Sequence, residues 1–233
     1  MRLAVIPARG GSKRIPRKNI RTFGGLPIIA WSIRAAIQSG CFDRIIVSTD
    51  DAEIAEVAKE CGAEAPFLRP GDLSDDHTGT VPVVAHAIRW FATEGAVAKE
   101  VCCLYATAPF VRASDLRKGL DMLRSTEADF AFSVTSYAFP IQRALRITAG
   151  QRVAMFQPEH LGTRSQDLEE AWHDAGQFYW GRSEAWLKNK PVFGQGSVPV
   201  LLPRHRVQDI DTPEDWERAE CMFRILSPEP GSE

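Results

Sequence analysis

The sequence predicts an α/β protein built on a doubly wound, mostly parallel β-sheet. Short apolar runs alternate along the chain with helical patterns of about 10–15 residues, and strands that alternate in this way need crossover connections that place helices on both faces of a parallel sheet. The 233 residues correspond to one large domain. The chain is 44% hydrophobic and 25% charged, which is ordinary for a folded protein. We therefore expect a single Rossmann-like domain over residues 1–233.

The first half of the chain begins with two strand and helix units. Arg2–Ala8 is an apolar run, and a helical pattern follows from about Pro27 to Ser39. Arg44–Ser48 is the second apolar run, and the second helical pattern extends from about Asp51 to Glu60. A glycine stands just beyond each helical pattern, where helices commonly end.

The alternation continues to residue 137. A third helix is expected near Val81–Thr93, followed by a strand at Val101–Tyr105. Ser114 is suited to the N-cap of a helix that extends to Arg124, because its hydroxyl can accept a backbone hydrogen bond. Phe130–Tyr137 is then expected to be a further strand.

From residue 138 to about residue 175 the alternation fails, because prolines and glycines interrupt every pattern. We interpret this segment as an insertion, either a β-rich lid or a dimerisation arm. Strand character returns at Gln177–Trp180 and Val198–Leu202. A helix from Pro213 to about Leu226 ends the fold, with Thr212 at its N-cap. The tail of residues 227–233 is expected to be frayed.

Composition and charge exclude several classes of protein. The 28 basic and 30 acidic residues give a formal charge of -2, without the basic excess typical of nucleic-acid-binding proteins. The chain has no apolar run of about 18 residues and no secretory signal, so we expect a cytoplasmic protein that does not enter membranes. The five cysteines are scattered and are expected to be reduced, with Cys102 and Cys103 on opposite faces of a strand. The histidines do not have zinc-site spacing.

Positive charge is concentrated near the N-terminus. Eight basic and no acidic residues precede Asp43, and five of the basic residues lie in the loop Arg9–Asn19: Arg9, Lys13, Arg14, Arg17 and Lys18. The glycines and serine of this loop, Gly10, Gly11 and Ser12, allow backbone N–H groups to approach phosphate oxygens closely. Because the loop follows the first strand, where ligands bind in such sheets, it is predicted to bind phosphates. It matches neither the Walker pattern nor GxGxxG. The alternatives are a solvated basic loop and a surface patch for RNA.

A pair of acidic residues near the C-terminus is a candidate metal site. In the segment Gln208–Trp216, Asp209 and Asp211 are separated by one residue, so an extended backbone projects both carboxylates from one face, about 7 Å apart. Carboxylate oxygens suit a hard divalent cation. The alternative is that Asp211 and Thr212 only begin the last helix and that Asp209 is solvated, although Thr212 could cap the helix by itself.

A third polar segment, Arg69–Thr80, links a short extended segment to a helix. Arg69, Thr78 and Thr80 could hydrogen-bond a base edge or a ribose. Residues of these types also build turns and caps, so composition leaves both interpretations open.

Four segments carry a family resemblance. They are Ile6–Asn19, Arg69–Thr80, Leu104–Phe110 together with Asp174–Gly181, and Gln208–Trp216. In these segments the chain resembles the nucleotidyltransferases that activate nine-carbon 2-keto sugar acids with CTP, the group that includes the CMP-sialic acid synthetases. LYATAPF and DAGQFYWG resemble the pseudaminate-specific branch. CMP-sialic acid synthetases have Gln-Pro-Thr-Ser-Pro at residues 105–109 and a glycine in place of Arg14.

The resemblance implies a nucleotide-diphospho-sugar transferase fold, a Mg²⁺ requirement and a homodimer in which the inserted segment reaches the partner. It implies that Ala8, Gly10 and Gly11 belong to the nucleotide site, that Arg9, Ser12, Lys13 and Lys18 contact the triphosphate, and that Asn19 lies near the ribose. Arg69, Thr78 and Thr80 would contact cytosine, and Tyr105, Gln177 and Tyr179 would lie along the sugar. Asp209 and Asp211 would hold Mg²⁺ and, with Arg9 and Lys18, would be catalytic.

The predicted reaction is an attack of the anomeric hydroxyl of pseudaminate on the α-phosphorus of CTP, which gives CMP-pseudaminate and diphosphate. The substrates are then CTP and a nine-carbon sugar acid, without a nucleic acid. The first alternative is a synthetase for CMP-N-acetylneuraminate or another CMP-ketoaldonate. A nucleotide-binding regulatory module is the non-enzymatic alternative.

Overall fold

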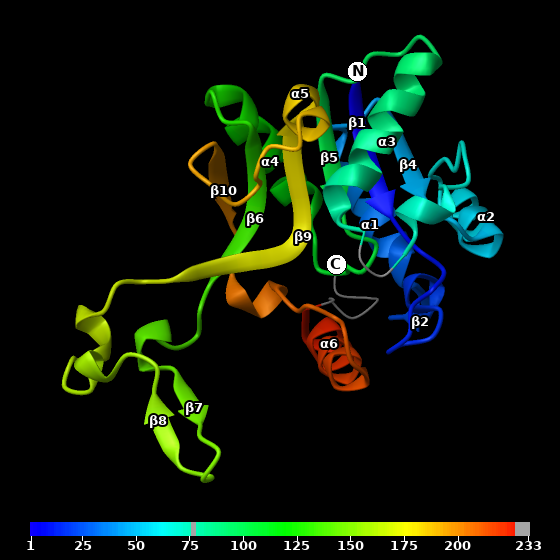
Figure 1. Ribbon diagram of the computed structural model, residues 1–233. Helices are drawn as coiled ribbons and strands as arrows, with labels where there is room; N and C mark the ends of the chain where they lie inside the picture. Colours follow the sequence, from blue (N-terminus) through cyan, green and yellow to red (C-terminus); the bar gives the residue numbers. More distant parts are fainter. Residues whose placement is uncertain (76–77, 227–233) are drawn as a thin grey trace, which may run out of the picture.

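The computed structural model describes residues 1–75 and 78–226, and its centre is the predicted α/β sheet (Figure 1). Six strands pair in the order β10-β6-β9-β5-β1-β4. Their bounds are β1 Arg2–Pro7, β4 Arg44–Ser48, β5 Glu100–Leu104, β6 Phe130–Ser136, β9 Trp172–Arg182 and β10 Ser197–Leu201. All pairings are parallel except those of β9, which is antiparallel to both of its neighbours. The mostly parallel sheet is therefore confirmed.

Helices cover both faces of the sheet, as the doubly wound fold requires. The helices are α1 Ile28–Ser39, α2 Ala52–Glu60, α3 Thr80–Thr93, α4 Ala113–Ser125, α5 Ser183–Leu187 and α6 Pro213–Leu226. Apolar residues of α1, α2 and α4 form one core with one face of the sheet, and those of α3 and α5 form a second core with the other face. Cys102 packs in the first core and Cys103 in the second, so the predicted opposite orientation of these thiols is confirmed.

A third, smaller core holds α6 against the region that follows β1. Ile15, Phe23, Ile28, Phe110 and Trp216 are buried together there. Phe23 belongs to a two-residue strand, β2 Thr22–Phe23, which forms a hairpin with β3 Leu26–Pro27. This core fixes the basic loop beneath α6, close to the segment that carries the two aspartates.

The inserted segment extends away from the sheet as an arm (Figure 1). It contains the hairpin of β7 Leu145–Ile147 and β8 Val153–Met155, which agrees with the β-rich interpretation. Its C-terminal boundary lies earlier than expected, because β9 begins at Trp172 and pairs with β6 from that residue onward. The arm therefore occupies about residues 138–171.

Two further details differ from the expectations. Ser114 lies inside α4 rather than at its N-cap, because the carboxylate of Asp115 accepts a hydrogen bond from the backbone N–H of Arg112, which is the N-cap. The short helix α5 and the β2–β3 hairpin were not expected. The tail of residues 227–233 lies outside the described residues. No helix in the described part of the chain is both long and apolar enough to cross a membrane.

Candidate active site

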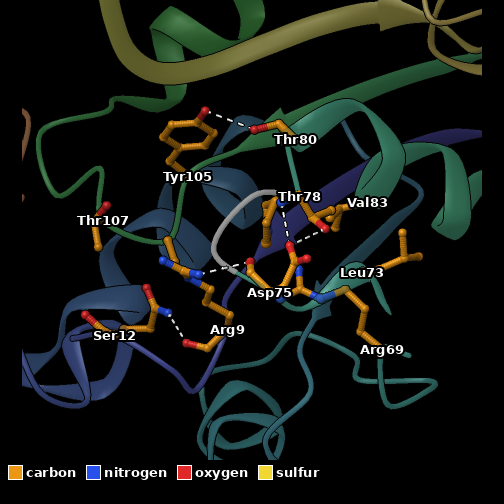
Figure 2. Close-up of a pocket in the computed structure, with 14 residues that line it drawn as sticks. Arg9, Ser12, Arg69, Leu73, Asp75, Thr78, Thr80, Val83, Tyr105 and Thr107 are labelled. Atoms are coloured by element: carbon orange, nitrogen blue, oxygen red, sulfur yellow. Dashed lines mark hydrogen bonds between the residues drawn. The ribbon is translucent and has the colours of Figure 1, made fainter. Parts of the chain in front are cut away.

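A cavity of about 340 Å³ opens at the carboxyl ends of β1 and β5 (Figure 2). Three segments form its walls: the loop after β1, the loop after β5 and the segment that precedes α3. Seven of the predicted site residues line it, namely Arg9, Ser12, Asn19, Arg69, Thr78, Thr80 and Tyr105. The sheet therefore brings together segments that are up to 100 positions apart in the sequence, from Pro7 to Thr107.

Side chains that hydrogen-bond to backbone groups of the basic loop hold it in place. The Asn19 side-chain amide donates to the Arg9 carbonyl at 2.9 Å, and the Gly10 N–H donates to Asp50 Oδ1 at 3.0 Å. A Cβ atom on Gly10 would lie 2.6 Å from Asp51 Oδ2, so this position requires glycine. Ala8 is buried and donates its N–H to the Ser48 carbonyl at 3.0 Å. Nothing lies within 4 Å of a Cβ built on Gly11, which leaves the tip of the loop open to a ligand.

The five cations of the loop do not all face the cavity. Arg17 pairs with Asp51 and Glu53 at the start of α2, so part of the positive charge of the loop is neutralised by these two carboxylates. Arg9 lines the cavity and donates from Nη1 to the Asp75 carbonyl at 3.0 Å (Figure 2). The sequence could not show this division, because Asp51 and Glu53 lie more than thirty positions from Arg17.

Lys18 and Arg14 connect the basic loop to the acidic pair. Lys18 Nζ donates to the Ile210 carbonyl at 2.7 Å and lies 3.2 Å from Asp211 Oδ1. An Arg14 guanidinium nitrogen lies 2.8 Å from Asp211 Oδ2. Both oxygens of Asp211 thus contact cations that the sequence assigned to phosphate binding.

The acidic pair does not serve as a helix cap. Thr212 and Asp215 form reciprocal bonds at the start of α6: Asp215 N–H donates to Thr212 Oγ1 at 3.2 Å, and Thr212 N–H donates to Asp215 Oδ2 at 2.8 Å. The carboxylates of Asp209 and Asp211 are therefore not used in the cap, and that of Asp211 contacts Lys18 and Arg14 instead. Desolvation and the like charge of Asp211 raise the pKa of Asp209.

Two carboxylates on one short segment fit a hard divalent cation, which prefers oxygen ligands and retains water or substrate oxygens as further ligands. No group of three or more metal-binding side chains occurs within residues 1–75 and 78–226.

The segment before α3 forms the far wall of the first cavity. Arg69 is 5% exposed, donates from Nε to Ser74 Oγ at 3.1 Å and has its pKa lowered by burial. Thr78 donates both its N–H and its hydroxyl to Asp75 Oδ1, at 2.6 and 2.7 Å. Arg69 and Thr78 both line the first cavity, so this segment contributes polar residues to its wall.

A second cavity, of about 600 Å³, adjoins the first one. Tyr105 lines both cavities, and its hydroxyl lies 3.1 Å from Thr80 Oγ1 (Figure 2). Tyr179 and Asp209 line the second cavity, so one wall carries a predicted sugar contact and a predicted metal ligand. A nucleotide in the first cavity and an acceptor in the second would meet at Tyr105.

The Tyr179 hydroxyl donates to Asp174 Oδ2 at 2.5 Å. Burial and the nearby Tyr105 and Asp174 raise the pKa of Tyr179, so this phenol stays protonated. Asp174 also accepts the Gly176 N–H at 2.9 Å. Tyr179 is thus held in one orientation at the cavity wall.

Gln177 has a different setting from Tyr179. It is 3% exposed, and its Nε2 donates to the Arg206 carbonyl at 2.6 Å. The predicted sugar contact of Gln177 therefore involves a side chain that lies behind the residues lining the second cavity.

Sequence reasoning gave no role to several charged residues at the site. Asp50 binds the basic loop, and four others line the second cavity: His173, Asp174, Arg204 and Arg218. Asp50 could have been found from its place just beyond the carboxyl end of a strand. Asp174 begins the DAGQFYWG segment but carried no assigned role.

The doubly wound sheet, the glycine-bearing basic loop and the paired cavities define a nucleotidyltransferase. The family model for cytidylyltransferases matches residues 3–197, and the chain belongs to this cytidylyltransferase family. The resemblance found in the four sequence segments is thereby confirmed.

Among curated relatives, the pseudaminic acid cytidylyltransferase of Campylobacter jejuni is 46% identical over 223 residues, which cover 96% of each chain. The CMP-N,N'-diacetyllegionaminic acid synthase of Legionella pneumophila is 32% identical, again over 96% of each chain. Among solved structures, a CMP:2-keto-3-deoxy-manno-octonic acid synthetase complexed with CTP superimposes with a TM-score of 0.71 at 17% identity, over 97% of this chain and 99% of that chain. This last likeness confirms the fold.

Proposed function

We propose that this cytidylyltransferase joins CMP to pseudaminate, with CTP as the donor and diphosphate as the second product. The observation that carries the proposal is the junction of the two cavities at Tyr105, beside a basic loop and an acidic pair that contact one another through Lys18 and Asp211. The choice of sugar is supported by the 46% identity to the Campylobacter jejuni relative, against 32% to the diacetyllegionaminate synthase.

The chemistry follows from charge and position. The anomeric hydroxyl of the sugar acid attacks the α-phosphorus in line, the new O–P bond forms, and the bond to the β-phosphate oxygen breaks as diphosphate leaves. CTP carries about four negative charges and the sugar acid one, so cations must hold the reactants together. Arg9 and Lys18 contribute that charge from the loop, and Ser12, Lys13 and Gly11 place hydrogen-bond donors around the triphosphate. The Gly10 N–H donates to Asp50, so Gly10 shapes the loop rather than bonding a phosphate.

The nucleoside and the sugar occupy different walls in this proposal. Arg69, Thr78 and Thr80 hydrogen-bond the cytosine, and Asn19 lies near the ribose while it orders the loop through the Arg9 carbonyl. Tyr105 and Tyr179 contact the sugar, and Gln177 supports them from behind.

Asp209 and Asp211 would hold Mg²⁺, which supplies charge neutralisation for the triphosphate when bound. The donor chemistry of two neighbouring carboxylates supports this assignment. Lys18 and Arg14 contact Asp211 in the nucleotide-free protein, and they can transfer to phosphate oxygens when a nucleotide enters.

The chain is also proposed to form a homodimer through its arm. The arm exposes several large apolar side chains, including Phe139 (83% exposed), Ile147 (73%) and Leu161 (73%), and so many exposed apolar side chains on one segment favour an interaction surface. Sedimentation of the wild-type chain is expected to give a dimer, and the I147D/L161D variant a monomer. A monomeric wild-type chain at micromolar concentration would contradict this part of the proposal. We also propose that the protein is cytoplasmic, because CTP is available there and the five free cysteines stay reduced.

The activity is tested by incubating the pure protein with CTP, Mg²⁺ and one sugar acid at a time, and by measuring diphosphate release. Pseudaminate is expected to give the highest kcat/KM among pseudaminate, N-acetylneuraminate and diacetyllegionaminate. Release with N-acetylneuraminate but not with pseudaminate would reverse the choice of sugar. CTP binding without diphosphate release from any sugar acid would instead indicate a regulatory module, and salt-sensitive retention on RNA an RNA-binding protein.

A further inference from the structure

A buried ion pair lies behind the wall of the second cavity. Arg206 and Asp115 are each 7% exposed, and their side chains form two hydrogen bonds, from Nη1 to Oδ2 at 2.6 Å and from Nη2 to Oδ1 at 3.1 Å. Neither residue lines the first or the second cavity. The pair joins residues 91 positions apart, and it adds a polar link between two segments that also meet through apolar packing of Phe110 and Ile210.

The first of these segments is the loop after β5. Asp115 lies in the first turn of α4 and accepts the backbone N–H of Arg112 at 3.1 Å. Arg206 also donates to the Phe110 carbonyl at 3.4 Å. The pair therefore fixes the C-terminal end of the loop that begins at Tyr105.

The second segment carries the acidic pair. Residues 207–211 have no regular secondary structure, so their course depends on the contacts at each end. At the C-terminal end these contacts are the buried side chain of Ile210, the bonds of Lys18 to the Ile210 carbonyl and Asp211, and the cap of α6. At the N-terminal end they are the Arg206 guanidinium and the Arg206 carbonyl, which accepts the Gln177 amide at 2.6 Å. Asp209 lies only three residues beyond this anchor.

We propose that Arg206 and Asp115 are positioning residues that set the place of Asp209 relative to Tyr105, and thereby the geometry in which metal and sugar acid meet. The inference rests on the proposed function of Asp209 and Asp211. A buried ion pair adds little to stability compared with well-packed apolar side chains of similar volume. Its bidentate geometry does fix two loops at one separation, which apolar contacts do not. Outer residues that orient metal ligands commonly contribute 10- to 100-fold to metal affinity or activity.

The test compares R206K, which keeps the charge but loses the bidentate geometry, with the apolar double variant D115L/R206M. R182M is the matched control, because Arg182 donates to three backbone carbonyls at the opposite end of the sheet. For each protein, the melting temperature, the Mn²⁺ affinity of the nucleotide-free form, the CTP affinity and the kcat and KM values are measured below the melting temperature of the least stable variant.

Both site variants are expected to bind Mn²⁺ about 10-fold or more weakly and to lose about 10²-fold in kcat, while CTP affinity changes less than about threefold. R182M is expected to lower the melting temperature without these losses. D115L/R206M loses the Arg112 cap bond besides the ion pair, so its melting temperature is expected to fall no further than that of R182M, which separates positioning from stability.

Wild-type Mn²⁺ affinity and kcat in R206K would overturn the inference, whether or not the double variant folds. The inference would also be overturned if R206K and R182M, with equal decreases in melting temperature, lost Mn²⁺ affinity and kcat to the same extent. The D209N variant distinguishes this result from a failure of the proposed function. If D209N binds Mn²⁺ as tightly as the wild type, the assigned metal role of Asp209 is wrong, and the conclusion about Arg206 does not arise.

Discussion

Lys18 Nζ lies 3.2 Å from Asp211 Oδ1, although 193 positions separate the two residues in the sequence. The contact joins the basic loop, which follows the first strand, to the segment that precedes the last helix. Candidate phosphate-binding cations and candidate metal ligands are therefore in direct contact. Their charges neutralise each other in the nucleotide-free protein. When a metal and a nucleotide bind, phosphate oxygens can replace Asp211 as the partner of Lys18, and the metal can replace Lys18 as the partner of Asp211.

Replacing Lys18 tests the cationic side of this arrangement. The K18M variant is expected to lose about 10²–10³-fold in kcat, because an electrostatic donor near the transferred phosphoryl group is removed. K59M is the matched control, since Lys59 forms an exposed pair with Glu56 on α2. Diphosphate release measures both variants. Equal kcat values for K18M and K59M would contradict the role of Lys18.

Replacing Arg14 tests the role of the Asp211 carboxylate in metal binding. Arg14 competes with a bound cation for Asp211 Oδ2, and both side chains are largely exposed, so the competition is worth a modest amount of free energy. The R14G variant is expected to bind Mn²⁺ about two- to fivefold more tightly than the wild type in the absence of CTP. Weaker Mn²⁺ binding in R14G would show that Arg14 supports the site rather than competing for it.

The main elements of the fold were predictable from local sequence patterns. Each element that was missed or misplaced has a local cause. The bounds of β4 and α6 agree with the prediction to the residue, because a β-branched run and a Thr-Pro helix start are unambiguous. The β2–β3 hairpin has two residues per strand, too few to show a period. At the start of α4 two neighbouring side chains could cap the helix. Asp115 rather than Ser114 accepts the hydrogen bond from the Arg112 N–H.

The site was predictable in its parts but not in its connections. The basic loop and the acidic pair are visible in the sequence, whereas the pairing of Arg17 with Asp51 depends on the tertiary fold. The orientation of Gln177 could not be derived by counting along the strand, because the register of β9 against β6 shifts between Phe132 and Val134. That irregularity breaks the alternation of faces on which such counting depends.

The contact between Tyr179 and Asp174 predicts a selective effect on the sugar acid. The Y179F variant leaves the buried part of Asp174 without its hydroxyl donor, and hydrogen bonds to charged groups are worth about 1.5–3 kcal/mol. KM for the sugar acid is expected to rise at least about 10-fold, with CTP affinity unchanged. Y137F serves as the control, because Tyr137 lines neither cavity. Equal KM values for the two variants would exclude Tyr179 from sugar binding.

The pair of Arg2 and Asp43 predicts a pH-dependent contribution to stability. Hydrogen bonds from Arg2 lower the pKa of Asp43 to about 2, so the contribution is complete above its ordinary pKa of 3.8 and is lost as the pH falls through about 2. Both side chains are partly exposed, which limits the effect to at most about 1 kcal/mol. Urea unfolding of the D43N variant is expected to show this deficit at pH 7 and a smaller one at pH 3. A deficit that grows on acidification would contradict the assignment.

The most direct measurement is a crystal structure of the protein soaked with CTP and Mg²⁺. The triphosphate is expected against the loop Arg9–Asn19, with the metal between it and the carboxylates of Asp209 and Asp211, and with the cytosine beside Arg69. A nucleotide bound elsewhere, with this loop and both aspartates making no contact to it, would contradict the account.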